Sequence, residues 1–388
     1  MVPGMNGEHA RIFRRKLSVE NDRIMNEHEH HTQPGPEGLL DLDEIMQAFG
    51  IQEWKNLGPV DAAAMPTEGL HLLVEFDGRR YLLRERPEGM IEEDLSHRYD
   101  FEQHLRQAGI PIPSAYLTPR GEPVVTQGDD NFELRQWVDG ELFSTRDTRS
   151  LTWVESAGAM LGRIHQASST YTGHRHHWPS EAHMGAMVQN WLNLARGKAE
   201  TSEIQAVTSA LTDWVEQWEA VLPSAMVSIG AGGALPEFHL HGDYHAQNLR
   251  FDDSGVIAVM GLEASRWEKR LFEVAYGLFY FSALAWVPGD SLTRPLVKRG
   301  FEPERARHFL QAYGALCPPV AGEAALLSDA LTIVSPIITM NGPLEDLFYT
   351  QGEAETALIE DVMDRLSWAT SLPAWLNRVR RSLAEWWV

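Results

Sequence analysis

The hydrophobic and polar positions in the first third of the chain alternate as in β-strands. The runs "LHLLVEF" and "RRYLLRER" are joined by the dipeptide "DG", which favours positive φ, so they predict a β-hairpin. Two later runs, "EPVVTQ" and "NFELRQWV", predict further strands. Helical spacing appears in "LLDLDEIMQAFG", which begins at an aspartate and ends near Gly50, and in "EEDLSHRYDFEQHLRQAG". Residues 37–137 are therefore expected to form a small antiparallel sheet with an accompanying helix.

Beyond residue 138 the pattern changes to apolar residues at three- and four-residue spacing, which is typical of helices. It is seen in "TWVESAGAMLGRIHQAS", "HMGAMVQNWLNLARG", "EIQAVTSALTDWVEQWEAVLP", "FEVAYGLFYFSALAW", "PERARHFLQAYGAL" and "LPAWLNRVRRSLAEWW". Trp153, Trp191, Trp214 and Trp218 fall on these apolar stripes, which favours core packing over stacking on a cofactor or a base. The chain is thus expected to be an α+β protein with a strand-rich lobe, residues 37–137, and a larger, mainly helical lobe, residues 138–388.

Residues 1–36 are polar, contain "EHEHHTQPGPEG" and show no apolar period, so a flexible tail is expected there. The 33 basic and 55 acidic residues give a formal net charge of -22, which repels nucleic-acid phosphates and anionic lipids. Neither nucleic acid nor a membrane is an expected partner. An acidic surface favours a cationic small molecule, although a solvated, solubilising face is the simpler interpretation.

A single cysteine, Cys317, excludes an intrachain disulfide and a cysteine zinc cluster, and it is expected to be a small buried residue. The start of the chain has no apolar core of the kind found in secretory signals, and the longest apolar run, residues 274–287, is shorter than the roughly 20 residues needed to span a bilayer. A cytoplasmic location is expected. The sequence does not indicate the oligomeric state.

The candidate chemistry lies in "HGDYHAQN", residues 241–248. Phosphoryl transfer needs an oriented acceptor hydroxyl and neutralised phosphate charge. Asp243 and Asn248 have the spacing of a kinase loop, in which the aspartate receives the hydroxyl proton and the asparagine oxygen binds Mg²⁺. His241 is expected to brace the loop rather than react, and His245 to be a hydrogen-bonded structural residue.

With these motifs, residues 37 to about 345 resemble the aminoglycoside phosphotransferase and choline kinase family. The hairpin, the "GIPIP" after a helix, the linker "ELRQWVDGEL" and the helix "SAGAMLGRIHQA" match the family's order of landmarks. The resemblance implies a two-lobed protein-kinase-like fold and a kinase that uses ATP (or GTP) and Mg²⁺ on a small-molecule hydroxyl. The residues it implies are Asp243 and His241 for catalysis, Arg84, Gly69, Gln136 and Val138 for the nucleotide, and Asn248 and Glu263 for the metal.

The segment after the loop departs from the family pattern. Where relatives have an aspartate that bridges metal and phosphates, this chain has Gly261, followed by Leu262 in place of phenylalanine. Strand alternation would put Glu263 on the same face as Gly261, roughly 6 to 7 Å along the strand, so its carboxylate would reach the metal only after the backbone rearranges. An aspartate introduced at position 261 is expected to restore the metal site.

The nucleotide-binding side is altered as well. Arg84 stands where relatives carry lysine, and its helix partner stays open among Glu102, Glu93 and Glu92, with Glu102 ranked first. The turn "VDAAAMPTEG" before the hairpin offers a single glycine, Gly69, to cover the phosphates. Two functions therefore remain: a small-molecule kinase with an impaired site, or a pseudokinase that binds a nucleotide, metabolite or protein without phosphoryl transfer.

Overall fold

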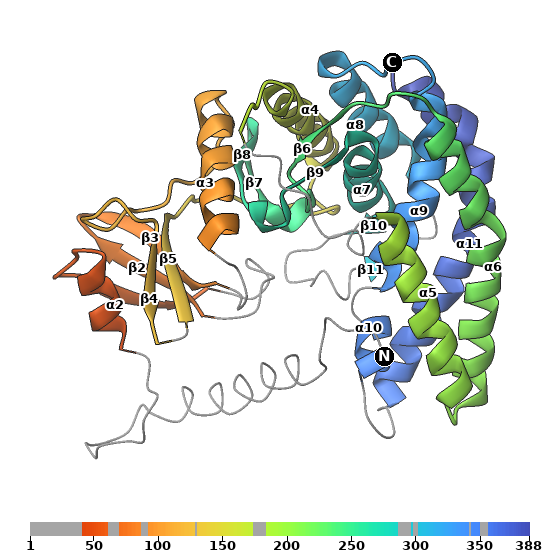
Figure 1. The fold of residues 1–388 in the computed structure, drawn as a ribbon, viewed down its shortest axis with the longest axis horizontal. Coiled ribbons are helices and arrows are strands. Elements are labelled where there is room, and N and C mark those ends of the chain that lie inside the picture. Colours follow the sequence, from red (N-terminus) through yellow and green to blue (C-terminus); the bar gives the residue numbers. More distant parts are fainter. Residues whose placement is uncertain are drawn as a thin grey trace. The chain divides into compact units, whose positions relative to one another are not determined.

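The computed structural model describes residues 41–60, 70–86, 92–128, 130–173, 184–285, 296–297, 302–340, 343–349 and 356–388. Within these ranges the chain divides into two compact units (Figure 1). The described residues up to 60, within 67–89 and within 114–137 form the first unit, and those within 90–113 and 138–388 form the second. The predicted tail, residues 1–36, and Gly69 lie outside the described residues.

The first unit is a five-stranded antiparallel sheet in the order β1-β2-β3-β5-β4. Its strands are β1 (Lys55–Pro59), β2 (His71–Phe76), β3 (Arg79–Glu85), β4 (Val124–Gln127) and β5 (Asp130–Gln136). The β2–β3 hairpin is confirmed, because Asp77 and Gly78 both have positive φ, 50° and 68°. Strand β1 was not predicted: it contains a glycine and a proline, which are turn signals, and proline is tolerated there because β1 is an edge strand.

Helix α2 (Leu42–Ala48) packs on one face of this sheet. Its predicted start is confirmed, because the side chain of Asp41 accepts a hydrogen bond from Glu44 N at 3.1 Å. Ile45 and Met46 join Val74, Leu83 and other sheet residues in one hydrophobic cluster. The first unit thus has a small core of its own.

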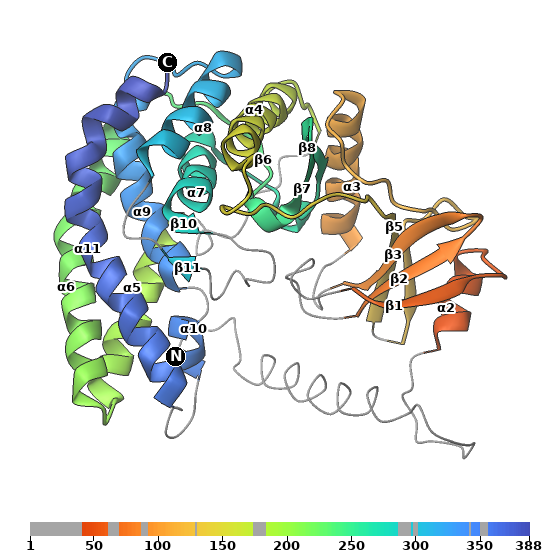
Figure 2. The same cartoon turned by 180° about the vertical axis from the view of Figure 1, so that it is seen from behind.

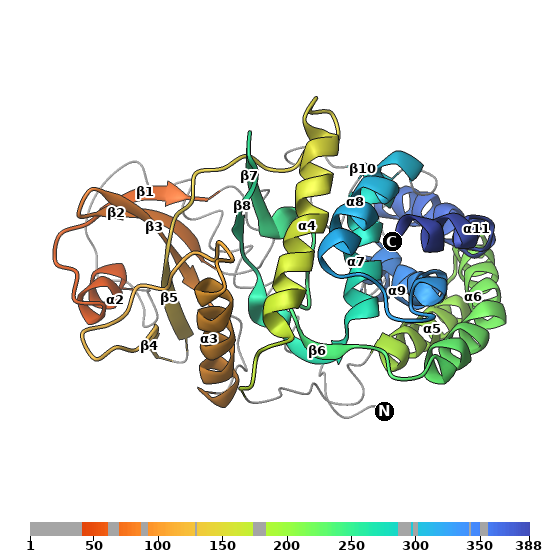
Figure 3. The same cartoon turned by 90° about the horizontal axis from the view of Figure 1, so that it is seen from above.

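The second unit is mainly helical, as expected (Figures 2 and 3). Its long helices are α3 (Glu92–Gln107), α4 (Ser150–Ser168), α5 (Met184–Thr201), α6 (Gln205–Ala231), α7 (Arg270–Ala283), α8 (Pro303–Leu316), α9 (Leu327–Met340) and α11 (Thr356–Trp386), with the shorter α10 (Pro343–Tyr349). Helices α9 and α10 were not predicted. Among the described residues, no helix has the length and apolar character required to cross a bilayer.

Short strands interrupt these helices and carry the candidate loop. They are β6 (Glu237–Leu240) paired with β9 (Arg266–Lys269), β7 (Leu249–Asp252) paired with β8 (Gly255–Val259), and the two-residue strands β10 (Leu284–Ala285) and β11 (Leu296–Val297). One-turn 3₁₀ helices lie at η2 (Ala246–Asn248), η3 (Leu262–Ala264) and η4 (Ala324–Leu326).

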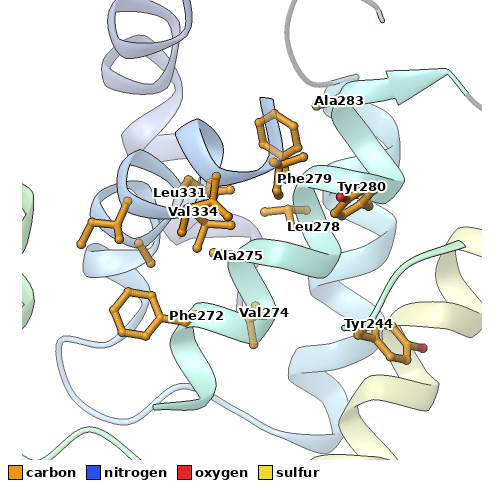
Figure 4. Packing of buried hydrophobic residues seen from close by; sticks show 14 of the residues in the cluster. Tyr244, Phe272, Val274, Ala275, Leu278, Phe279, Tyr280, Ala283, Leu331 and Val334 are labelled. Carbon is orange, nitrogen blue, oxygen red and sulfur yellow. The ribbon is translucent and has the colours of Figure 1, made fainter. Parts of the chain in front are cut away.

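The core of the second unit surrounds α7, which contacts α8 and α9. Figure 4 shows Ala275 and Leu278 of α7 facing Leu331 and Val334 of α9. Three of the four tryptophans placed in the core by the sequence are fully buried, and Trp191 is partly buried against Phe348. Cys317 is buried, as predicted.

Candidate active site

The loop 241–248 connects β6 to β7, so a strand pair holds each of its ends. Its glycine, Gly242, has φ +90°, and a Cβ built there would lie 1.9 Å from the carbonyl oxygen of Ala264. Only glycine combines this backbone conformation with so close an approach. The glycine of the motif therefore lets the segment after β8 pack directly against the loop.

A buried carboxylate on α7, Glu273, anchors the loop backbone. It accepts hydrogen bonds from His241 N at 3.1 Å and Gly242 N at 2.5 Å. It also bonds to His165 Nε2 of α4 at 2.8 Å, and His165 Nδ1 lies 2.8 Å from the Tyr313 hydroxyl. Burial raises the pKa of Glu273, but the hydrogen bonds from His165 and from Gly242 N outweigh it and keep the pKa low. Sequence reasoning missed this anchor; its signal was an acid inside an apolar helical stripe.

His241 is fully buried, and both of its ring nitrogens form hydrogen bonds with backbone groups of the site, so it braces the loop. Nε2 donates to the carbonyl of Met260 at 2.7 Å, and Nδ1 accepts from Asp243 N at 3.2 Å. Burial lowers the pKa of His241, so the ring is neutral and its tautomer follows from these two partners. These contacts fix the ring within the loop, and the role of His241 in catalysis stays a prediction.

Asp243, the predicted base, presents its carboxylate to three side-chain donors. Oδ1 accepts from the Tyr276 hydroxyl at 2.7 Å, and Oδ2 lies 3.1 Å from both His245 Nε2 and Asn248 Nδ2. Burial raises the pKa of Asp243, but the charge and hydrogen bond of His245 and the hydrogen bond of Tyr276 outweigh it, so the pKa falls well below its usual value. The side chain is still 36% exposed. It is an ionised acceptor that a ligand can reach.

Asn248 is turned so that its amide nitrogen faces Asp243. Nδ2 donates to the Asp243 backbone carbonyl at 2.8 Å as well as to the carboxylate, so Oδ1 points away from Asp243. A Cβ built at Gly261 would lie 2.6 Å from this Oδ1 and 2.5 Å from Nδ2. The amide of Asn248 thus occupies the space next to position 261, which contradicts the expectation that an aspartate there would simply restore the site.

The segment around Glu263 is not a strand. β8 ends at Val259, Gly261 has φ +77°, and Glu263 lies in the 3₁₀ turn η3. The predicted strand alternation between positions 261 and 263 is therefore wrong, because the left-handed residue turns the chain. Glu263 Oε1 lies 3.4 Å from Arg98 Nη1 of α3, and the Glu263 side chain is 23% exposed.

This donor set fits Mg²⁺ only modestly. Mg²⁺ is usually held by one or two carboxylates together with waters and phosphate oxygens. Here the candidate ligands are one neutral amide oxygen, that of Asn248, and one carboxylate, that of Glu263, which is paired with Arg98. Among the described residues there is no group of three or more His, Cys, Asp or Glu suited to a metal ion.

The predicted nucleotide-binding residues Arg84 and Gln136 lie in the sheet unit. Arg84 is paired with Glu133 of the neighbouring strand, a fully buried carboxylate that also binds Arg86 at 2.6 Å and Arg135 at 3.0 Å. Gln136 N donates to Ser114 O at 3.0 Å. Val138 is the first residue of the last segment of the second unit. Glu102 is paired with Arg98 and Arg106 of its own helix. Its predicted pairing with Arg84 stays a prediction.

A small antiparallel sheet and a larger helical portion that carries the His-Gly-Asp loop define a protein-kinase-like fold. The sequence profile of the phosphotransferase enzyme family matches residues 68–322, about two thirds of the chain. The chain belongs to this family, which confirms the resemblance seen in the sequence. No curated protein matches it significantly.

Solved structures of kinases share the fold at low sequence identity. A microcompartment-associated aminopropanol kinase has a TM-score of 0.61 at 14% identity, covering 88% of this chain and 97% of that one. Choline kinase from Cryptosporidium parvum Iowa II has 0.57 at 12%, with 85% and 91% covered. The amicoumacin kinase hAmiN, in complex with AMP-PNP, Ca²⁺ and Ami, has 0.53 at 16%, with 98% and 96% covered. These similarities establish the fold.

Proposed function

We propose that the chain transfers a phosphoryl group from ATP (or GTP) to a hydroxyl of a small molecule. The observation that carries the proposal is the loop around Asp243: an ionised, partly exposed carboxylate on a backbone fixed by Glu273, beside an asparagine whose oxygen is turned away from it. In this role Asp243 accepts the acceptor's hydroxyl proton, and His241 holds the loop without reacting.

The remaining parts follow from the same proposal. Arg84 would bind nucleotide phosphates on the sheet unit, with Gly69, Gln136 and Val138 close to the nucleotide. Asn248 and Glu263 would hold Mg²⁺, which supplies neutralising charge at the phosphates. Support for these cofactors comes from hAmiN, which was solved with AMP-PNP and Ca²⁺. Glu263 has to leave Arg98 to take part.

An acceptor panel tests the proposal directly. Purified protein is incubated with ATP or GTP, Mg²⁺ and aminopropanol, choline or spectinomycin, compounds of the kind that structurally similar proteins are named for. The net charge of -22 favours such cationic acceptors. We expect a phosphomonoester product by mass spectrometry, together with ADP or GDP. Failure to consume either nucleotide with any acceptor, or with water, would refute the proposal.

A second candidate function, ligand binding without phosphoryl transfer, is favoured by one observation. Gly261 offers no metal ligand and the only acid in η3 is engaged by Arg98. Thermal unfolding with ATP, with and without Mg²⁺, separates the two candidates. Ligand at 100 times its dissociation constant stabilises a fold by about 2.7 kcal/mol, which is readily measured. For a kinase, Mg²⁺ should increase the stabilisation by ATP, and Glu263→Gln should reduce that increase. A pseudokinase should be stabilised by ATP to the same extent with and without Mg²⁺, or should not be stabilised by ATP at all.

A further inference from the structure

The hydroxyl of Tyr276 donates to the same carboxylate oxygen that an acceptor would approach. Tyr276 lies on α7, three residues after Glu273, so the two side chains share a helix face directed at the loop. Its hydroxyl is 2.7 Å from Asp243 Oδ1. Burial and the charge of Asp243 raise the pKa of Tyr276 well above its ordinary value, so the phenol stays protonated and acts as a donor.

Counting lone pairs locates the position left for an acceptor. An ionised carboxylate accepts about four hydrogen bonds, two on each oxygen. His245 and Asn248 take both positions on Oδ2, and Tyr276 takes one on Oδ1. Among the described residues no other side chain donates to this carboxylate, so the open position is the second one on Oδ1.

The open position lies next to Tyr276. Two donors at about 2.7 Å from one oxygen, separated by the angle between its lone pairs, are about 4 to 5 Å apart. An incoming hydroxyl would then lie beside the Tyr276 phenol. Because Oδ1 is shared, the phenol also limits how a water molecule or an alcohol can be oriented there.

Given the proposed phosphotransfer, on which this inference rests, we propose that Tyr276 lines the acceptor site and determines how the acceptor hydroxyl is presented to Asp243. The phenol ring forms one wall of the site, and the phenol hydroxyl keeps the carboxylate oriented toward the acceptor. It also occupies a position on Oδ1 at which water would otherwise be activated. Tyr276 thereby favours transfer to the acceptor over hydrolysis of the nucleotide.

The test compares Tyr276→Phe with Tyr244→Phe. Tyr244 provides a matched control, because its buried hydroxyl also makes one 2.7 Å hydrogen bond, but to Ala157 O of α4 and not to Asp243. Figure 4 shows its hydroxyl directed away from α7. Each variant loses one phenol hydrogen bond of the same length. Total ADP release and phosphorylated acceptor are measured separately in the presence of the acceptor identified in the panel above. ADP release is then measured again without any acceptor, so that only water can receive the phosphoryl group.

We expect Tyr276→Phe to lower kcat for transfer to the acceptor about tenfold, with the KM for ATP unchanged, and to raise ADP release into water. The fraction of consumed ATP that ends as phosphorylated acceptor should fall. Tyr244→Phe should keep the wild-type fraction. If no panel compound is phosphorylated, the rise of ADP release into water is the readout.

Three results would overturn the inference. In the first, the fraction is unchanged in Tyr276→Phe. In the second, it changes equally in Tyr244→Phe, which would indicate general destabilisation. The third is a wild type that consumes no nucleotide with any acceptor or with water; this would refute the proposed function itself, and the role of Tyr276 with it. The first two leave the proposed function standing, so the two failures are distinguishable.

Discussion

At Gly242 the chain passes so close to the carbonyl oxygen of Ala264 that no side chain fits. We expect Gly242→Ala to lower the free energy of unfolding by about 3 kcal/mol, because left-handed strain adds to a steric clash with backbone. Gly233→Ala is the matched control: its φ is also positive, +78°, but nothing lies within 4 Å of its Cβ, so about 1 kcal/mol is expected. Urea unfolding measures both, and equal losses would contradict the close approach.

Single residues of the site were predictable where their spacing in the chain carries the chemistry. Asp243 and Asn248 come from one short loop, and the structure places them in hydrogen-bond contact. Tyr276 was not predictable, because it reaches the loop from a helix some thirty residues later and looks like part of an apolar stripe. Glu273 stands out as an acid in that stripe, but its partner in the loop, at the same distance in the chain, could not be predicted. Their roles depend on tertiary packing.

A protonation prediction concerns His165, the fully buried partner of Glu273. Burial lowers the pKa of His165, although Glu273 acts in the opposite sense. The folded state therefore keeps His165 neutral, whereas the unfolded state binds a proton below its usual pKa of about 6.5. The free energy of unfolding should fall as the pH drops below this value, by up to about 1.4 kcal/mol per pH unit for one histidine.

The variant His165→Gln removes this titration and should flatten the slope of unfolding free energy against pH between pH 6.5 and 5.5. It should also be less stable than the wild type at pH 7, because glutamine does not reproduce both bonds of the imidazole ring. Urea unfolding at several pH values provides the measurement. Parallel slopes in the two proteins would show that His165 is not kept neutral by the fold.

Helices α4 and α8 pack closely at Gly158 of α4, where the backbone of α8 leaves no room for a side chain. A Cβ at Gly158 would lie 2.3 Å from Phe309 O of α8. We expect Gly158→Ala to destabilise the protein by about 1 to 3 kcal/mol, since neither helix backbone can move without repacking. Gly197→Ala on α5, where nothing lies within 4 Å, should instead stabilise it by about 0.5 to 1 kcal/mol through helix propensity. Thermal unfolding distinguishes the signs; a stabilising Gly158→Ala would contradict the close contact.

The elements that sequence analysis missed share a physical cause. Every residue of α9 is buried, so it shows no contrast between apolar and polar faces, on which helix prediction depends. Strand β1 contains Gly58 and Pro59 and belongs to an edge. The segment 261–264 looked like a strand because it follows one, but a left-handed glycine ends that strand. The amphipathic helices and the β2–β3 hairpin were predicted because pattern and turn residues agree.

At the scale of the whole molecule, a change of period near residue 137 predicted both the strand-rich and the helical parts, and the phosphotransferase family match confirms the fold class. Activity does not follow from the fold. The chain keeps Asp243, the proposed base, and Asn248 but lacks an acid at position 261.

The most direct measurement is the rate of nucleotide consumption by the wild type and by Asp243→Asn at saturating Mg²⁺·ATP and acceptor. Because Asp243 is the proposed base, the rate should fall by about 10² to 10⁴ in Asp243→Asn. Asp252→Asn, a change of the same chemistry at a side chain that bonds Ser254 in the β7–β8 turn, should keep the wild-type rate. Equal rates in the wild type and Asp243→Asn would contradict the account.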